Sequence, residues 1–552
     1  MVRSSKLKVE PRISNHEHRK RVTFLSSEKK MSARLMIQGT SSSVGKSVLA
    51  AAFCRIFYQE GYQVSPFKAQ NMALNSFVTA AGGEMGRAQV VQAQAAGVDP
   101  DVRMNPILLK PSGPSGSQVI IMGQSQGNVT ALRYHGEYQR MTWPSVQDAL
   151  HSLLDEFEIL VIEGAGSPAE VNLKSNDIVN MRVALEAKSP VLLVADIDRG
   201  GALASVVGTL ELLEPEEREL VKGIIFNKFR GELALLQPAL DFIEERTGIP
   251  VVGVVPYFKI RIPDEDSVAL SESMEKPAVS HSEQLDIAVI RLPYISNFTD
   301  FDALQDEEDV SVRYVTELGN LGKPDLIILP GSKNTLADLR FLHESGIGEQ
   351  ISKLTKDNVP LIGICGGYQM MGRTVLDPLH TESELEEVSG LGILPMVTEF
   401  YPQKHTVQST GTILSKQNFF EACTGDTVVG YEIHMGRSTP DEGQAPLFTL
   451  TSHGVSYPDG LQAGNSYGTY LHGIFDNDSL RTALLSWLWQ RRGICRPVEA
   501  TLSQASLRES AFNELADLVR QSVDLERVRA IMGLDPQSIQ HAAAASATNA
   551  VS

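Results

Sequence analysis

The chain has 552 residues, enough for two or three domains that each bury a core of their own. Its apolar share of 42% and charged share of 21% are ordinary for a globular protein, and it has no run of about eighteen apolar residues that could span a membrane. The 67 acidic against 49 basic residues give a net charge of −18, which argues against a nucleic acid as partner.

The two ends of the chain and its cysteines favour a cytoplasmic protein. Residues 1–30 are polar and lack the apolar segment of a secretory signal, so we expect a disordered tail there, and Met31 could be the natural start. A second disordered tail is expected at residues 536–552. The four cysteines lie far apart without metal-binding spacing, which fits reduced thiols.

A glycine- and serine-rich loop separates a predicted strand at residues 34–38 from a predicted helix at 48–58. Such a loop turns backbone N–H groups toward a polyphosphate, its lysine reaches the phosphates, and its serine hydroxyl binds Mg²⁺. The spacing departs from the strict pattern because a threonine stands at the first glycine position; a serine-rich turn without a ligand is the alternative. The expected ATP-binding residues of this loop are Gly39, Thr40, Gly45, Lys46 and Ser47.

The stretch 31–275 alternates predicted strands with helices, which indicates a parallel sheet covered on both faces. Ligands of such sheets bind at the carboxyl ends of the strands. Three polar residues at those ends suit phosphate chemistry: Glu163 as an Mg²⁺ ligand, Lys68 as a neutralising charge, and Asn227 as a reader of an adenine edge. The predicted strands after the first lie at residues 62–66, 158–162, 190–195, 221–226 and 251–255.

A second α/β pattern begins after a linker that we place at residues 276–284, and it fills a domain at 285–500, followed by closing helices at 501–535. A strand at its centre runs into Cys365, which glycines flank and a helix follows. This is the pattern of a nucleophile elbow, in which the helix N-terminus favours the thiolate. A buried inert cysteine is the alternative. His472 and His434 both qualify as the partner imidazole, and spacing does not choose between them.

Both halves carry family resemblances. GICGGYQ at 363–369, together with GTYLHG at 468–473, resembles a class I (triad) glutamine amidotransferase domain of flavodoxin-like α/β fold. GTSSSVGKS at 39–47 resembles the dethiobiotin-synthetase-like P-loop family. The two halves in this order resemble the corrinoid amide synthases, and KAQNMALN at 68–75 and EGAGSPAEVNL at 163–173 resemble the cobyric acid synthase versions of the motifs.

The resemblance implies a glutamine-hydrolysing, ATP-dependent carbon–nitrogen ligase of cobalamin (vitamin B12) biosynthesis. Such enzymes amidate the b, d, e and g carboxylates of adenosylcobyrinic acid a,c-diamide through acyl phosphates. Cys365 would attack glutamine and release ammonia, His472 would move protons, and backbone N–H groups near Gly331 and Gly366 would form the oxyanion hole. The carboxylate that many triad enzymes carry two residues after the histidine is missing, which predicts a Cys–His dyad, with Asp476 as a candidate helper.

Two other readings stay open. One changes the substrate to the a and c carboxylates of cobyrinic acid or to a cell-wall precursor, and the other is a non-amidating P-loop ATPase. The latter leaves Cys365 and His472 without a purpose. Candidate corrinoid contacts are Asn71, Asn75 and His434. Ammonia route, amidation order and oligomeric state do not follow from the sequence.

Overall fold

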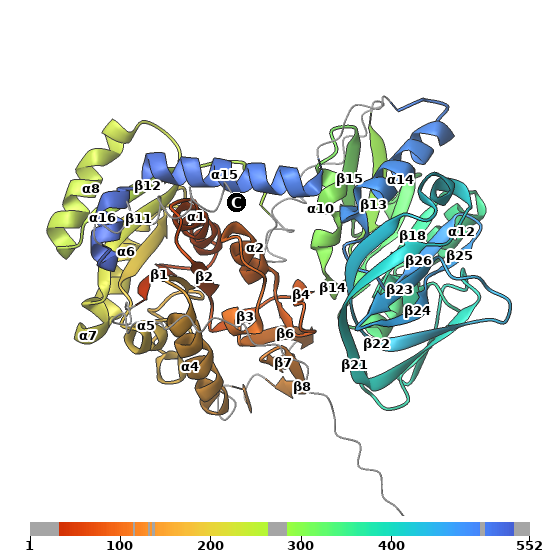
Figure 1. The fold of residues 1–552 in the computed structure, drawn as a ribbon, viewed down its shortest axis with the longest axis horizontal. Coiled ribbons are helices and arrows are strands. Elements are labelled where there is room, and N and C mark those ends of the chain that lie inside the picture. The colour runs from red at the N-terminus through yellow and green to blue at the C-terminus, as the bar shows by residue number, and fades with distance from the viewer. Residues whose placement is uncertain are drawn as a thin grey trace, which may run out of the picture. The chain divides into compact units, whose positions relative to one another are not determined.

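A six-stranded parallel sheet organises the first half of the chain, as predicted (Figure 1). This computed structural model describes residues 32–113, 116–130, 133–134, 139–262, 284–496 and 503–534. The expected tails, and the linker except for its last residue, lie outside them. In the order β12-β11-β10-β1-β9-β2, the strands are β12 (Val251–Pro256), β11 (Val221–Phe229), β10 (Val191–Asp196), β1 (Ala33–Gly39), β9 (Ile159–Glu163) and β2 (Val64–Phe67).

Side chains alternate between the two faces of this sheet, and each face supports its own core. Met36 belongs to one apolar cluster, while its neighbours Leu35 and Ile37 belong to the other. The helices of this half are α1 (Lys46–Gln59), α2 (Arg87–Ala95), α4 (Gln139–Glu156), α5 (Met181–Ala187), α6 (Ala202–Leu212), α7 (Pro215–Arg218) and α8 (Leu233–Thr247), with short 3₁₀ helices η1 (Val102–Met104) and η3 (Lys174–Asn176).

Two small sheets between α1 and α4 were not predicted; β3, β4 and β5 have only three residues each. A four-stranded sheet has the order β3-β6-β7-β8, and a hairpin joins β4 to β5. Their bounds are β3 (Gln70–Met72), β4 (Ser76–Val78), β5 (Glu84–Gly86), β6 (Ile107–Gly113), β7 (Gly116–Ile121) and β8 (Gln124–Thr130).

The second half contains a second α/β sheet, of order β15-β13-β16-β18-β26-β25, which is parallel except for its last strand. Its strands are β13 (Leu285–Ile290), β15 (Val310–Val315), β16 (Leu326–Leu329), β18 (Leu361–Ile364), β25 (Leu461–Ala463) and β26 (Ser466–Thr469). The helical segments are η4 (Phe298–Phe301), α10 (Asp302–Gln305), η5 (Leu318–Asn320), α11 (Thr335–Glu344), α12 (Ile347–Lys356), α13 (Gly366–Met370), η6 (Asn418–Cys423), η7 (Ile474–Asp476) and α14 (Asp478–Arg491).

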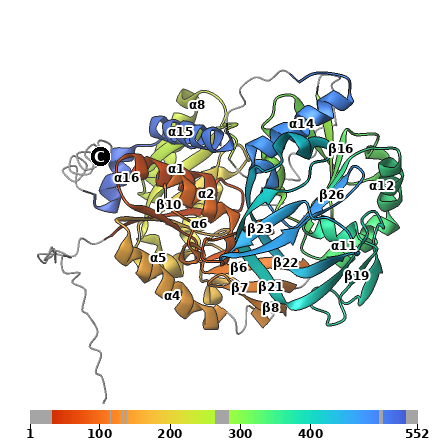
Figure 2. The same cartoon turned by 45° about the vertical axis from the view of Figure 1, so that its right-hand side comes forward.

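A largely antiparallel sheet packs beside it and is built around two long paired strands, β21 and β22 (Figure 2). Its strands are β19 (Thr374–Leu376), β20 (Glu387–Ser389), β21 (Met396–Ile413), β22 (Thr427–Pro440), β23 (Phe448–Ser452) and β24 (Val455–Asp459), and a short pair is formed by β14 (Ile295–Ser296) and β17 (Gly331–Ser332).

The closing helices α15 (Gln504–Ser522) and α16 (Leu525–Met532) return to the first half, and α15 lies beside α1 (Figure 1). Phe512 and Leu515 enter the same apolar cluster as Phe53 of α1. Arg55 also pairs with Glu509 at 2.6 Å. The first half of the chain is therefore completed by the far end of the chain.

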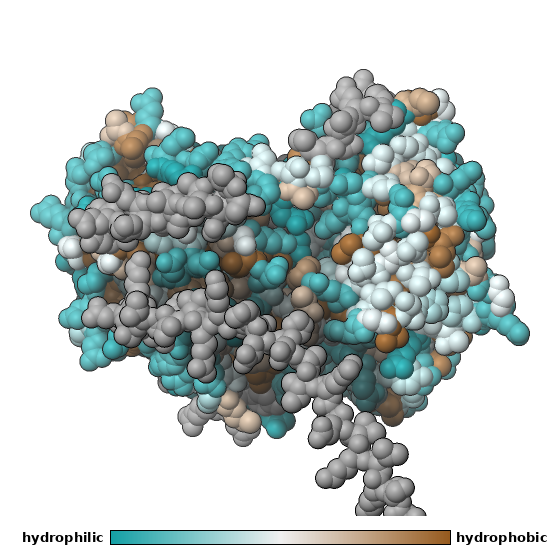
Figure 3. Space-filling model, in the orientation of Figure 1, coloured by the Kyte–Doolittle hydropathy of each residue, from teal (hydrophilic) through white to brown (hydrophobic). Residues whose placement is uncertain are grey.

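The surface seen in Figure 3 is mostly hydrophilic, and hydrophobic residues occur there in separated patches. Among the helices that the structure describes, none combines the length and apolar character needed to cross a bilayer.

Candidate active sites

The loop after β1 has the backbone of a phosphate-binding loop. Gly45 caps α1 with a φ of 98°, and a Cβ built there would lie 2.2 Å from Asn227 Nδ2, so only glycine fits. Lys46 lies across the loop, and its Nζ donates to the carbonyls of Ser41 and Gly166, at 3.0 Å each. Its cation is thus directed at the loop where a phosphate chain would lie.

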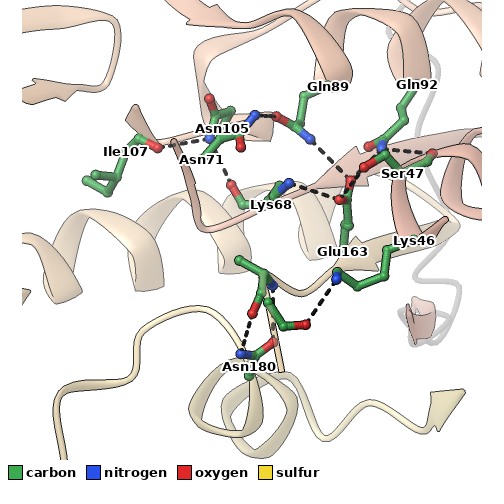
Figure 4. A network of polar contacts seen from close by, with 12 residues as sticks. Lys46, Ser47, Lys68, Asn71, Gln89, Gln92, Asn105, Ile107, Glu163 and Asn180 are labelled. Carbon is green, nitrogen blue, oxygen red and sulfur yellow. Dashed lines mark hydrogen bonds and ion pairs between the residues drawn. The ribbon is translucent and has the colours of Figure 1, made fainter. Parts of the chain in front are cut away.

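Glu163 stands at the end of β9, buried among donors (Figure 4). Its Oε1 accepts from the Ser47 hydroxyl at 2.7 Å and from Lys68 Nζ at 2.9 Å. Gln92 donates to Oε2 at 2.6 Å, and Gln89 donates to it at 3.3 Å. The structure therefore brings together the loop serine, the lysine and the carboxylate that the sequence placed at separate strand ends. The two glutamines were missed; their three-residue spacing on one helix face was the available signal.

Asn227 packs under the loop. Its Nδ2 donates to the Val44 carbonyl at 2.8 Å, while its buried Oδ1 lacks a partner among the described residues. Thr40 continues the line of β1, and its N–H donates to Val194 at 2.9 Å. An orphaned acceptor at the base of a glycine-lysine-serine loop fits a nucleotide site, because buried acceptors are normally satisfied.

Cys365 lies at a sharp turn between β18 and α13, with φ 50° and ψ −107°, a conformation that non-glycine residues rarely adopt. The helix that follows packs closely on the end of β16, since a Cβ on Gly367 would meet the Leu329 carbonyl at 2.0 Å. The thiol donates to the Ile433 carbonyl at 3.5 Å. This strained turn at a helix N-terminus is the geometry of a nucleophile elbow.

His472 lies in the same cavity as Cys365, and Asp300 holds it. Its Nδ1 donates to Asp300 Oδ2 at 2.7 Å, and Asp300 Oδ1 accepts the Gly473 N–H at 3.0 Å. Burial by itself would lower the pKa of His472, but the charges and hydrogen bonds of Asp300 and Cys365 raise it to about 10. The imidazole therefore carries a proton beside the thiol at neutral pH.

The expected dyad is therefore a Cys–His–Asp constellation, and Asp476 is not its helper. The carboxylate of Asp476 faces Arg508, at 3.7 Å. Asp300 was missed because it lies in a short 3₁₀ helix 172 residues before His472, and no local pattern marks it.

His434 lines the same cavity but makes other contacts. Its Nδ1 donates to the Gly436 carbonyl at 2.8 Å, and its ring stacks on Tyr470 with centroids 3.9 Å apart. Both candidate imidazoles face a carboxylate, but His472 lies 2.7 Å from Asp300 whereas His434 lies 3.5 Å from Glu432, so His472 has the closer partner.

The two expected oxyanion-hole glycines lie near this thiol. A Cβ on Gly331 would be 3.1 Å from His472 Cε1, and one on Gly366 would be 2.8 Å from the Ser332 N–H. Gly331 thus lies against His472, and Gly366, which follows Cys365 in the chain, lies against the residue that follows Gly331.

The cavity is lined by charged side chains from both halves of the chain: Lys110 and Lys333 are buried, and Glu382 and Lys404 are partly buried. Burial raises the pKa of Glu382 to about 7, although Lys333 opposes that shift. An amino-acid substrate with its own ammonium and carboxylate matches such a mixed lining.

The two asparagine candidates for corrinoid contact are engaged elsewhere. Asn71 is buried and donates to Gln89 Oε1 at 3.1 Å. Asn75 is fully buried, and its Oδ1 accepts the Phe298 N–H at 3.0 Å. Asn75 therefore joins two segments of the chain rather than facing an open surface, contrary to expectation.

Comparison with known proteins matches each half separately. Residues 35–267 match the CobQ/CobB/MinD/ParA nucleotide binding domain, and residues 286–480 match the CobB/CobQ-like glutamine amidotransferase domain. The latter match fits the Cys365 elbow, and the former fits the loop at Gly45 to Ser47.

Curated relatives match almost end to end. Cobyric acid synthase from Desulfitobacterium hafniense (strain DSM 10664 / DCB-2) is 69% identical over 512 residues, covering 92% of this chain and 99% of that protein. Cobyric acid synthase from Moorella thermoacetica (strain ATCC 39073 / JCM 9320) is 55% identical, with 92% and 98% covered. The chain is thus an amide-forming ligase with a glutamine amidotransferase domain, and it belongs to the cobyric acid synthase family.

Proposed function

We propose that the protein converts adenosylcobyrinic acid a,c-diamide to cobyric acid, by amidating its b, d, e and g carboxylates at the expense of ATP and glutamine. The observation that carries this proposal is the 69% identity to a cobyric acid synthase across nearly the whole of both chains. The two sites described above supply the chemistry that such a reaction needs.

In the glutaminase half, the Cys365 thiolate attacks the side-chain amide carbon of glutamine. The imidazolium of His472 donates a proton to the departing nitrogen, so that ammonia leaves and a thioester remains for water to hydrolyse. Asp300 acts through His472, by fixing which ring nitrogen faces the thiol and by stabilising the imidazolium. Gly331 and Gly366 contribute N–H groups to the developing oxyanion.

In the nucleotide half, a corrinoid carboxylate attacks the γ-phosphorus of ATP, and ammonia then displaces phosphate from the acyl phosphate. Activation is needed because a carboxylate has no good leaving group. Lys46 and Lys68 would neutralise charge on the transferring phosphoryl group. The hydroxyl of Ser47 and carboxylate of Glu163 are hard oxygen donors 2.7 Å apart, a set that suits Mg²⁺, which would polarise the phosphates.

We place this reaction in the cytoplasm, where ATP, glutamine and reducing conditions are available. All four cysteines are free, which agrees with that placement. We keep the domain limits inferred from sequence, 31–275 and 285–500, and assign α15 and α16 to the first domain, because both helices pack into its core.

The test is incubation of the purified protein with adenosylcobyrinic acid a,c-diamide, Mg-ATP and glutamine, followed by mass spectrometry. Four successive carboxylate-to-amide conversions are expected. Amidation of cobyrinic acid or of a cell-wall precursor instead, or ATP hydrolysis without amide formation, would overturn the proposal.

A matched control separates the two sites. Cys365→Ser should lose glutamine-dependent amidation and keep amidation with added ammonium salt, because the nucleotide half, which forms the acyl phosphate, is unchanged.

A further inference from the structure

Three metal-ligating side chains meet on the long strand pair β21–β22. His405 lies directly opposite His434 in the antiparallel register, with ring centroids 5.1 Å apart. Glu432 precedes His434 by two residues and so points to the same face of the strand. One ligand atom from each residue lies within 4.8 Å of the other two.

The hydrogen bonds around these residues leave acceptor atoms of His434 and Glu432 that face one another without a donor between them. Because a carbonyl only accepts, the bond from His434 Nδ1 to Gly436 puts a proton on Nδ1, and in the neutral ring Nε2 is then an acceptor. That Nε2 is buried and has no hydrogen-bond partner in the described part of the chain. Its nearest polar neighbour is another acceptor, Glu432 Oε2, at 3.5 Å.

The carboxylate of Glu432 is likewise oriented by hydrogen bonds to one of its two oxygens. Glu432 Oε1 accepts from the hydroxyls of Ser409, at 2.7 Å, and Tyr457. Its Oε2 is turned toward His434 Nε2 and toward His405 Nε2, 3.9 Å away. A cation between these three atoms would satisfy all of them at once.

We propose that His405, Glu432 and His434 form a binding site for a divalent transition-metal ion of the zinc class. Two imidazoles and one carboxylate are a ligand set of such ions, and three protein ligands leave a position for water. Gly436, Ser409 and Tyr457 supply the outer hydrogen bonds that fix the ligands. His405 is 41% exposed, so the site has an entrance.

The site adjoins the glutaminase pocket without sharing its reacting groups. Ile433, between two of the ligands, accepts the hydrogen bond of the Cys365 thiol at 3.5 Å. A bound ion would therefore clamp the strand that carries this carbonyl.

The experiment is a titration of the chelator-treated, full-length Cys365→Ser protein with Co²⁺, followed by competition with Zn²⁺. The Cys365→Ser background removes the thiol that lies beside His472, a thiol–imidazole pair that could itself take the ion. One Co²⁺ per chain is expected, with visible ligand-field absorption, no thiolate charge-transfer band, and displacement by Zn²⁺.

His405→Ala should weaken binding by at least about tenfold, since even outer-shell changes cost about that much. His151→Ala is the matched control, because His151 pairs with Glu186 at 3.0 Å outside any three-ligand cluster, and it should bind as the parent does. Glu432→Gln, which keeps the side-chain shape, serves as a second variant if the first misfolds.

Absence of Co²⁺ binding at millimolar concentration would overturn the proposal. A proton, held in an imidazolium–carboxylate pair, would then be the cation that bridges these side chains. Binding that survives both His405→Ala and Glu432→Gln would overturn the proposal equally.

Discussion

Asp300→Asn removes one negative charge from the glutaminase site and leaves its shape. Asp300 accepts from His472 Nδ1 at 2.7 Å, and both side chains are about 2% exposed, so water does not replace the lost charge. Removing one partner of a buried ion pair costs about 3–5 kcal/mol. At about 1.4 kcal/mol per tenfold, this predicts a fall in glutaminase kcat of about 10²–10⁴.

The assay is glutamate release at saturating glutamine, with ammonia-dependent amidation as the internal reference. The fall should appear in kcat with little change in KM, because the carboxylate does not touch glutamine. The ammonia-dependent reaction should be unchanged, which would exclude general unfolding.

Asp476→Asn is the matched control, because Asp476 faces Arg508 rather than His472. It should keep glutaminase activity within about threefold, as surface-type changes do. The reasoning is refuted if Asp300→Asn stays within the same range, or if both variants fall equally.

Three further results are expected. Glu163→Gln should lower ATP-dependent amidation by at least about a hundredfold and spare glutaminase activity, measured in parallel, because the carboxylate serves only the nucleotide half. The raised pKa of His472 contributes stability that is full below about 6.5 and is lost as pH rises toward about 10, so urea unfolding should show a decline over that window which is smaller in the Asp300 variant. Lys404→Met removes one of the two cations paired with Glu84, at 2.6 Å, and leaves Lys110 at 2.9 Å, so it should lower the free energy of unfolding by about 1.5–3 kcal/mol; an unchanged urea midpoint would contradict this.

Features set by local backbone rules were predictable from the sequence. The strand before Gly39, the helix after Lys46 and the elbow at Cys365 each need particular residue types within a few positions, and the structure has each element where the pattern indicated it. Their roles in binding and catalysis remain predictions. The regular strand–helix alternation likewise predicted the parallel sheet.

Features set by tertiary contacts were not predictable. Asp300 reaches His472 only because η4 and the end of β26 come together in the folded chain. The hairpin β4–β5 has two three-residue strands, too short for a period of two to be recognised. The asparagines of the first half looked like ligand contacts because buried structural amides and binding amides have the same sequence signature.

The same hairpin packs the first half of the chain against the surroundings of His472. Phe77 packs edge-on against Tyr431, with centroids 5.0 Å apart, and Tyr431 stacks on His472 at 5.3 Å. Asn297 Nδ2 donates both to the Ser76 carbonyl, at 3.2 Å, and to the Tyr431 hydroxyl, at 3.0 Å. The first half thus packs against the ring that supports the catalytic imidazole. Because packed aromatic contacts of this kind resist displacement, the position of the His472 ring depends on the packing of both halves of the chain.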